Sequence, residues 1–126
     1  MLITTIPQYV QGLKNVKLVA ITDATADGAI LYTAPSAADF NASVITSILV
    51  SEYSGNADTI TVTVTDSTAT FSLFKVKAVA ANTTIELLTK DLILQSGDVI
   101  RASAATASRL HVVASIQELA LHRTPQ

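Results

Sequence analysis

Cysteine and tryptophan are absent from this chain of 126 residues, and glycine, proline and aromatic residues are few. Without cysteine there are no disulfides and no thiol nucleophile, so a secreted scaffold held together by disulfides is not indicated. A single domain of this length buries roughly two thirds of its surface and folds without such cross-links. The composition therefore predicts one domain with a sizeable hydrophobic core.

Charge is also scarce. Charged residues make up 14% of the chain, and 8 basic and 10 acidic residues give a net charge of −2. The basic residues are scattered, whereas nucleic-acid-binding proteins gather them on one face, so no nucleic-acid partner is expected. Soluble proteins normally guard the faces and edges of their sheets with charge. The scarcity favours a surface covered by other subunits over the alternative, a compact sandwich with polar hydroxyl faces.

Long hydrophobic runs are missing as well, although hydrophobic residues reach 49% of the chain. None of the apolar runs approaches the ~20 residues that a membrane-spanning helix needs. The first residues, Met-Leu-Ile-Thr-Thr-Ile-Pro, have neither a basic segment nor a long apolar core, so no signal peptide is expected. We therefore expect no membrane partner.

The stretch from residue 43 to residue 65 has the clearest pattern in the sequence. Its second half alternates strictly, with Ile60, Val62 and Val64 on one side and Thr59, Thr61, Thr63 and Thr65 on the other. Successive side chains of a strand point to opposite faces, so this half is predicted to be a strand with one apolar and one hydroxyl face. Residues 54–57 are turn formers. Together these features predict a β-hairpin.

Short strands separated by turns account for the rest of the chain. They are expected over residues 16–22, 29–33, 69–79, 91–94, 99–104 and 110–119, with an extended segment favoured over a short helix for residues 82–90. Turn signals every 8–12 residues are typical of an all-β domain, a single antiparallel β-sandwich or jelly roll of about eight strands. The inward-facing side chains are predicted to be Ile60, Val62, Val64, Leu94, Ile100, Val112 and Ile116.

The predicted sandwich covers residues 16–121, between an N-terminal arm (residues 1–15) and a polar C-terminal tail (residues 122–126). The apolar side chains of the arm follow no period, and Pro7 and Gly12 oppose a continuous helix. Such side chains pack either on the protein's own core or on a neighbour. The candidate partner-contact residues are Leu2, Ile3, Ile6, Tyr9, Val10 and Leu13.

Groups that could perform catalysis do not converge in this sequence. The motifs of serine hydrolases, zinc proteases and phosphate loops are absent, and His111 lies inside a predicted strand, where a structural or exposed role is usual. Asp23 and Asp27 fail the spacing of a calcium loop. We expect no enzyme activity, no catalytic residues, no metal site and no cofactor.

Two further sets of side chains have a structural and a functional interpretation. Glu52, Asp58 and Asp66 flank the predicted hairpin and could gather at one end of the sandwich, although carboxylates at strand ends are usually solvated caps. Tyr9, Tyr32 and Tyr53 could stack against sugars, but they lie in three separate segments.

Four pieces of the chain between Tyr32 and Leu119 carry a family resemblance. They are Tyr32-Thr-Ala-Pro35; Val44-Ile-Thr-Ser-Ile-Leu-Val50 with Ser54-Gly55 and the alternation after it; Leu92-Ile-Leu-Gln-Ser-Gly-Asp-Val-Ile100; and Leu110-His-Val-Val-Ala-Ser115 with Glu118. The third is similar to a Leu-x-Leu-x-x-Gly-Asp-x-Ile pattern. In these pieces the chain resembles small structural proteins of tailed bacteriophage virions.

This resemblance implies a β-sandwich that assembles symmetrically on the head, neck or tail of a virion, with no catalytic signature. The first expectation is a capsid decoration (cement) protein, a homotrimer that contacts itself and the major capsid protein or other virion proteins. It would be found in the virion, after assembly in the host cytoplasm. The alternatives are a neck or tail component and, from another class, a carbohydrate-binding or adhesin module with a groove lined by Tyr32 or Tyr53.

Overall fold

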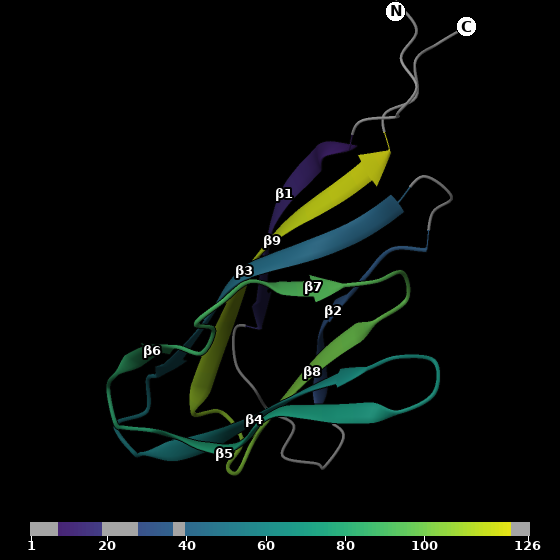
Figure 1. Cartoon of the computed structure of the whole chain (residues 1–126). Coiled ribbons are helices and arrows are strands. Elements are labelled where there is room, and N and C mark those ends of the chain that lie inside the picture. Colours follow the sequence, from purple (N-terminus) through teal and green to yellow (C-terminus); the bar gives the residue numbers. More distant parts are fainter. Residues whose placement is uncertain (1–7, 19–27, 37–39, 122–126) are drawn as a thin grey trace, which may run out of the picture.

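The computed structural model describes residues 8–18, 28–36 and 40–121, with the backbone alone for residues 8–18, 40, 41 and 121. Within these residues the chain folds into nine strands and no helix (Figure 1). The strands are β1 (Gln8–Leu18), β2 (Ala29–Thr33), β3 (Phe40–Glu52), β4 (Asp58–Thr65), β5 (Thr70–Val79), β6 (Thr84–Glu86), β7 (Leu92–Leu94), β8 (Val99–Ala104) and β9 (Leu110–Leu121). The predicted all-β fold is confirmed.

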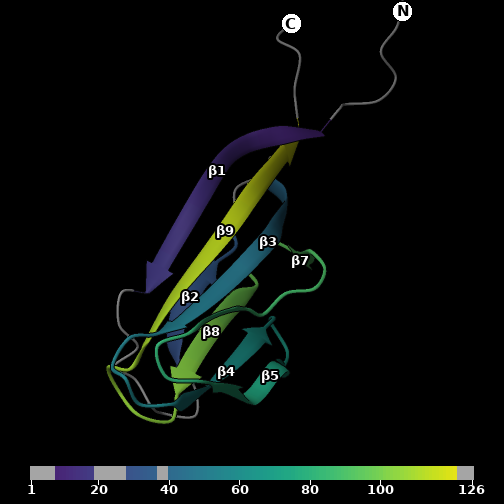
Figure 2. The same cartoon turned by 90° about the vertical axis from the view of Figure 1, so that its left-hand side faces the viewer.

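Two antiparallel sheets form the sandwich. In the five-stranded sheet β1, β9 and β3 lie side by side, and the short strands β6 and β7 both pair with the far edge of β3. The four-stranded sheet has the order β2-β8-β4-β5. Figure 2 looks onto the five-stranded sheet, with β1, β9 and β3 in front of β2 and β8. The core lies between the two sheets.

The side chains predicted to point inward fill this core. Ile60, Val62, Leu94, Ile100, Val112 and Ile116 are at most 2% exposed, and Val64 is partly buried against the same cluster. Burying one such side chain completely contributes roughly 1.5–3 kcal/mol. The threonines between them on β4 are half-buried, as the alternation predicts.

The predicted hairpin between β3 and β4 is wrong. β3 pairs with β9, β6 and β7 in one sheet, whereas β4 pairs with β5 and β8 in the other. Residues 53–57 therefore form an arch that carries the chain from one sheet to the other. Alternation determines which face of a strand is apolar, but it does not determine which strand lies beside it. Here the two apolar faces meet across the core.

A β-bulge in β3 explains why this strand alternates less clearly. The register with β9 shifts between Ile45 and Ser47, so Thr46 is an extra residue, and its hydroxyl donates to the Ser115 carbonyl oxygen at 3.3 Å. The bulge changes which residues face the core. Ile45 points inward before it and Ile48 points inward after it, and both are fully buried.

Glu86 occupies the gap between the two short strands at the edge of β3. β7 pairs with residues 43–45 and β6 with residues 49–51, which leaves the bulge region between them. There the Ile48 backbone N–H donates to Glu86 Oε2 at 2.8 Å, and the Ser47 hydroxyl also donates to Glu86. The side chain of Glu86 thus replaces a strand partner where the ladder is interrupted.

β4 and β5 form a tight hairpin at Asp66, where the sequence predicts a turn. The Asp66 backbone N–H donates to the Ala69 carbonyl oxygen at 3.0 Å, and Asp66 Oδ1 accepts from the N–H groups of Thr68 and Ala69. These hydrogen bonds lower the pKa of Asp66 below its ordinary value. Asp66 therefore acts as a turn cap.

Part of the predicted N-terminal arm belongs to the five-stranded sheet. β1 begins at Gln8, and its register with β9 runs from Gln8 opposite Leu121 to Leu18 opposite Val112. Residues 8–15 therefore belong to the sheet, and the boundary predicted at residue 15 is wrong. The absence of a clean period is consistent with a register shift between Val10 and Gly12, where the strand is irregular.

Candidate functional site

The three carboxylates beside the predicted hairpin do not gather. Glu52 ends β3 and Asp58 begins β4, so both lie at the arch, but Asp66 lies beyond the opposite end of β4. An eight-residue strand spans roughly 25 Å. No site that uses all three carboxylates together can form.

Glu52 holds the arch together. Its side chain is only 2% exposed. It accepts hydrogen bonds from the backbone N–H groups of Ser54 at 2.8 Å, Gly55 at 3.0 Å and Asn82 at 2.9 Å, and from the Ser54 hydroxyl. One buried carboxylate therefore ties the arch to the turn that precedes β6.

Burial of Glu52 acts to raise the pKa of its carboxyl group, but the hydrogen bonds from Ser54, Asn82 and Gly55 outweigh it and lower the pKa from 4.5 to about 2. Because the pKa of Glu52 is lower in the folded state than in the unfolded state, its ionised carboxylate stabilises the fold at pH values above the unfolded pKa. This contribution is lost as the pH falls from 4.5 towards 2.

We therefore expect Glu52→Gln to lower stability at neutral pH and to flatten the loss of stability between pH 4.5 and 2. Urea unfolding at a series of pH values measures both effects. Asp91→Asn, which removes an exposed carboxylate away from the arch, is the control. An acid profile of Glu52→Gln that matches the wild type would contradict this assignment.

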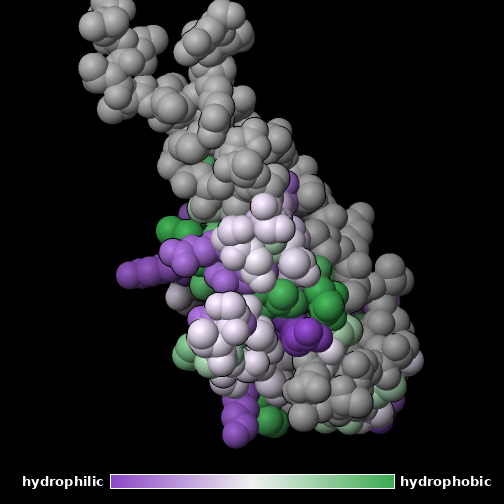
Figure 3. All heavy atoms as spheres, turned by 90° about the vertical axis from the view of Figure 1, so that its right-hand side faces the viewer, coloured by the Kyte–Doolittle hydropathy of each residue, from purple (hydrophilic) through white to green (hydrophobic). Residues whose placement is uncertain are grey.

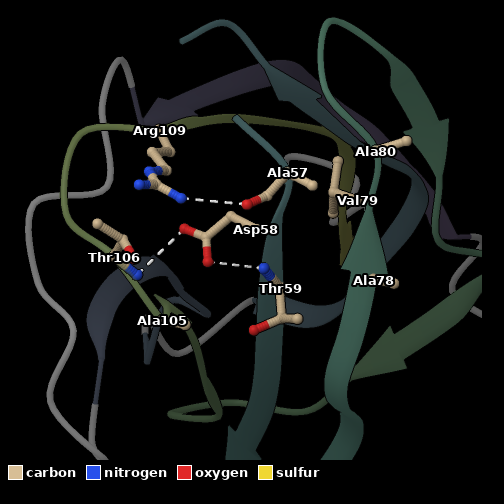
Figure 4. Close-up of a pocket in the computed structure, with 9 residues that line it drawn as sticks. All are labelled: Ala57, Asp58, Thr59, Ala78, Val79, Ala80, Ala105, Thr106 and Arg109. Atoms are coloured by element: carbon tan, nitrogen blue, oxygen red, sulfur yellow. Dashed lines mark hydrogen bonds between the residues drawn. The ribbon is translucent and has the colours of Figure 1, made fainter. Parts of the chain in front are cut away.

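A hollow of about 560 Å³ opens beside the arch (Figure 4). Its polar groups are engaged in holding turns. Asp58 accepts from the backbone N–H groups of Thr59 at 2.8 Å and Thr106 at 3.1 Å, and Arg109 donates to the Ala57 carbonyl oxygen at 3.1 Å. Small apolar side chains form much of the rest of the wall. The arrangement joins the arch to the turn before β9 and brings no nucleophile next to a base.

Tyr32 is a core residue. It is 6% exposed, and its hydroxyl lies 2.7 Å from Ser43 Oγ and donates to the Glu118 carboxylate. Burial, the hydrogen bond to Glu118 and the charge of Glu118 raise the pKa of Tyr32 above its ordinary value, against a smaller lowering effect of Ser43. A ring held in this way cannot line a sugar-binding groove. Tyr53 is 42% exposed, but its ring stacks on His111 with the centroids 4.0 Å apart.

The outer face of the five-stranded sheet, which points away from the core, is poor in charge. The described side chains at its centre are Val44, Ser47, Leu49, Ser51, Ile93, His111, Val113, Ser115, Gln117 and Leu119, with Thr84 and Glu86 at the margin. Leu49 lies opposite Val113, and Ile93 lies opposite Val44, so apolar pairs cross the strands. This face is the candidate functional surface.

The outer face of the four-stranded sheet differs. β4 contributes its threonines, and Arg101 of β8 lies at the register position between Thr63 of β4 and Ile30 of β2. A view from this side of the molecule shows hydrophilic side chains in separate groups among paler and hydrophobic ones (Figure 3). A positive charge in the middle of this face makes it less suited to dry burial.

The exposed edges of the four-stranded sheet are protected against pairing with another chain. At β5, Lys75 and Lys77 flank Val76, whose φ of 53° and 60% exposure mark an irregularity in the strand. At the other edge, β2 is only five residues long and is soon followed by Pro35. Edge-to-edge extension of this sheet is therefore disfavoured.

Comparisons with known proteins assign the chain to no family. No family model matches the chain, and no curated protein matches it in sequence. Among solved structures, a chain in the structure of infectious bursal disease virus Gx strain is similar, with a TM-score of 0.49 and 10% sequence identity. The match covers 88% of this chain and 32% of the viral chain, so the protein spans about a third of that neighbour.

Within residues 8–18, 28–36 and 40–121, no group of three or more His, Asp or Glu side chains is placed to hold a metal ion. The same residues contain no helix long and apolar enough to cross a bilayer. Asp23 and Asp27, the weak calcium candidates, lie outside the described residues.

The candidate arm residues divide into two groups. Leu2, Ile3 and Ile6 lie outside the described residues. Tyr9, Val10 and Leu13 lie on β1, where the backbone pairs with residues 117–120 of β9. The outer face of the five-stranded sheet is not among the sites predicted from the sequence. The available signal was the run of consecutive apolar residues in Ile48-Leu49-Val50 and Val112-Val113, which is typical of strands covered on both sides.

Proposed function

We propose that this protein is a structural component of a tailed bacteriophage virion, with capsid decoration as its role. It works by burying surface against copies of itself and against the shell, and it carries no catalytic chemistry. The observation that supports this proposal best is the outer face of the five-stranded sheet, where apolar and hydroxyl side chains replace the charges usual on a free sheet.

The exposed apolar side chains on this face support assembly. Leu49 is 40% exposed and Ile93 is 66% exposed, although both lie on strands whose other side packs into the core. Single exposed apolar residues are common, but here two apolar pairs, Leu49 with Val113 and Ile93 with Val44, lie on one face with the uncharged Ser47 and Ser115 between them, which is typical of an interaction site. The family resemblance of residues 32–119 supports the same role independently.

The neck or tail of the virion is the second location, because the same face would serve assembly there equally well. The carbohydrate-binding alternative loses support. Tyr32 is buried, and one face of the Tyr53 ring stacks on His111, so of these two tyrosines only the other face of Tyr53 is left for a sugar.

Co-sedimentation with shells tests the proposal. Full-length protein is expected to pellet with empty shells purified from the phage that encodes it, and to saturate at a fixed ratio to the major capsid protein. Protein that stays in the supernatant with purified shells, necks and tails alike would exclude a virion role.

The arm can be tested in the same assay. The described β1–β9 ladder contains none of Leu2, Ile3 and Ile6, so replacing these three with serine changes no residue of it. We expect the triple variant to melt like the wild type and to bind shells at least about tenfold more weakly, a loss of about 1.4 kcal/mol. Unchanged binding would show that these three residues do not contact the shell.

A further inference from the structure

The outer face of the five-stranded sheet has the composition of a surface that meets a copy of itself. In a two-fold contact each patch faces the same patch, so any charge in its middle meets a charge of its own sign. Apolar pairs such as Leu49 with Val113 avoid this conflict. On the outer face of the four-stranded sheet, Arg101 would face a second Arg101 or lie close to it, so the conflict between like charges would remain.

We propose that two copies of this chain pack the outer faces of their five-stranded sheets against each other, as a closed two-fold pair. The contact resembles the packing of two sheets in a β-sandwich, in which inner faces interdigitate about 10 Å apart. This inference deepens the proposed virion role by naming the partner of this face. The placement of the pair on a virion rests on the proposed function, whereas the formation of the pair does not.

The charges at the margins of the face are compatible with such a pair. The row that contains Leu49 and Val113 ends at Glu86 on β6 and at the register position of Lys17 on β1. One acidic and one basic position leave the row without net charge. The Glu86 carboxylate already accepts hydrogen bonds from Ser47 and Ile48, so it needs no partner across the contact.

The available area reaches the threshold for a weak pair. Between His111 and Leu119 the face extends about 27 Å along the strands, and four strands span about 19 Å across it. Each copy therefore offers about 500 Å² of flat sheet area, and a pair covers about 1,000 Å² in total, which is the threshold for a biological interface and lies below the roughly 1,200–2,000 Å² of stable ones. The long strands lie side by side across this face (Figure 2).

The geometry favours a pair over the trimer implied by the family resemblance. A three-fold contact joins two different surfaces of neighbouring subunits. On the four-stranded sheet, Arg101 lies in the middle of the outer face, and Lys75, Lys77 and Pro35 protect the edges, so that sheet is poorly suited to such a contact. The free edge of β1 is the other described surface that a three-fold contact could use. A two-fold contact needs only one kind of surface, and the outer face of the five-stranded sheet, with no charged side chain at its centre, can serve on both copies.

Sedimentation equilibrium of the full chain tests the pair. We expect the wild type to have the mass of two chains and Leu49→Lys to raise the dissociation constant at least tenfold. Leu49 is 40% exposed, so lysine there leaves the monomer folded, which circular dichroism verifies. Thr33→Lys, at an exposed position on the other sheet, is the matched control and is expected to remain paired. A monomeric or trimeric wild type, or a Leu49→Lys pair as tight as the wild type, overturns the inference.

The absence of cysteine allows a second test that does not depend on a disruptive substitution. Leu49→Cys carries one thiol per chain, and a short bis-maleimide is expected to link it into covalent dimers. Thr33→Cys is expected to stay monomeric on denaturing gels. Equal cross-linking of the two variants would contradict the proposed face. A wild-type pair that fails to pellet with shells, necks and tails alike would exclude the virion role and leave this inference standing.

Discussion

Val62→Asp is expected to unfold the protein, whereas Thr63→Asp, at the next position of β4, is expected to leave it folded. Val62 is completely buried between the sheets, where a carboxylate has no water and no cationic partner within its apolar cluster. The combined loss of packing and burial of a charge costs about 4 kcal/mol or more, a large share of the stability of a small domain.

Thr63 provides the control because it points to the opposite side of the same strand. Its side chain is half-buried, and its register neighbour on β8 is Arg101. An aspartate there stays near solvent and beside a positive charge, so we expect a change within about 1 kcal/mol. Urea unfolding followed by circular dichroism compares the two variants. If Thr63→Asp proved the more damaging, the two faces of β4 would be reversed.

The faces of the strands could be predicted from the sequence because side-chain alternation is a local property. Every inward position predicted on β4, β7, β8 and β9 is buried or partly buried. The strand partners could not be predicted in this way. Residues 54–57 are equally suited to a hairpin and to an arch, and a contact that holds the arch, from Asn82 N–H to the Glu52 carboxylate, joins residues 30 positions apart.

The limits of local patterns also explain the other differences between the structure predicted from the sequence and the observed one. The Thr46 bulge reverses the parity of β3, so a regular period cannot be read through it. The candidate surface depends on which strands become neighbours. Leu49 and Val113 lie far apart in the sequence and form a cross-strand apolar pair only in the register of β3 with β9. Patterns within either strand show an excess of apolar residues but not a continuous face.

Gly28→Ala is expected to be the most damaging of the glycine substitutions at described positions. Gly28 has a φ of +72°, which disfavours any side chain, and it lies directly before β2. A Cβ atom at this position would lie 2.6 Å from the carbonyl oxygen of Ala102 and 2.8 Å from its carbonyl carbon. These are backbone atoms of β8, which pairs with β2 on one side and β4 on the other, so they cannot move without disturbing two ladders.

Gly97→Ala separates the effect of φ from the effect of space. Gly97 has a φ of +82°, as expected for its turn, but a Cβ there would meet no atom within 4 Å. We expect Gly97→Ala to cost about 1 kcal/mol and Gly28→Ala about 3 kcal/mol or more, because only the second adds a clash with backbone to the strain. Thermal and urea unfolding of both variants measure the difference. Equal losses would mean that β2 can shift away from β8, and that the close approach of Gly28 to Ala102 does not hold this edge of the sandwich.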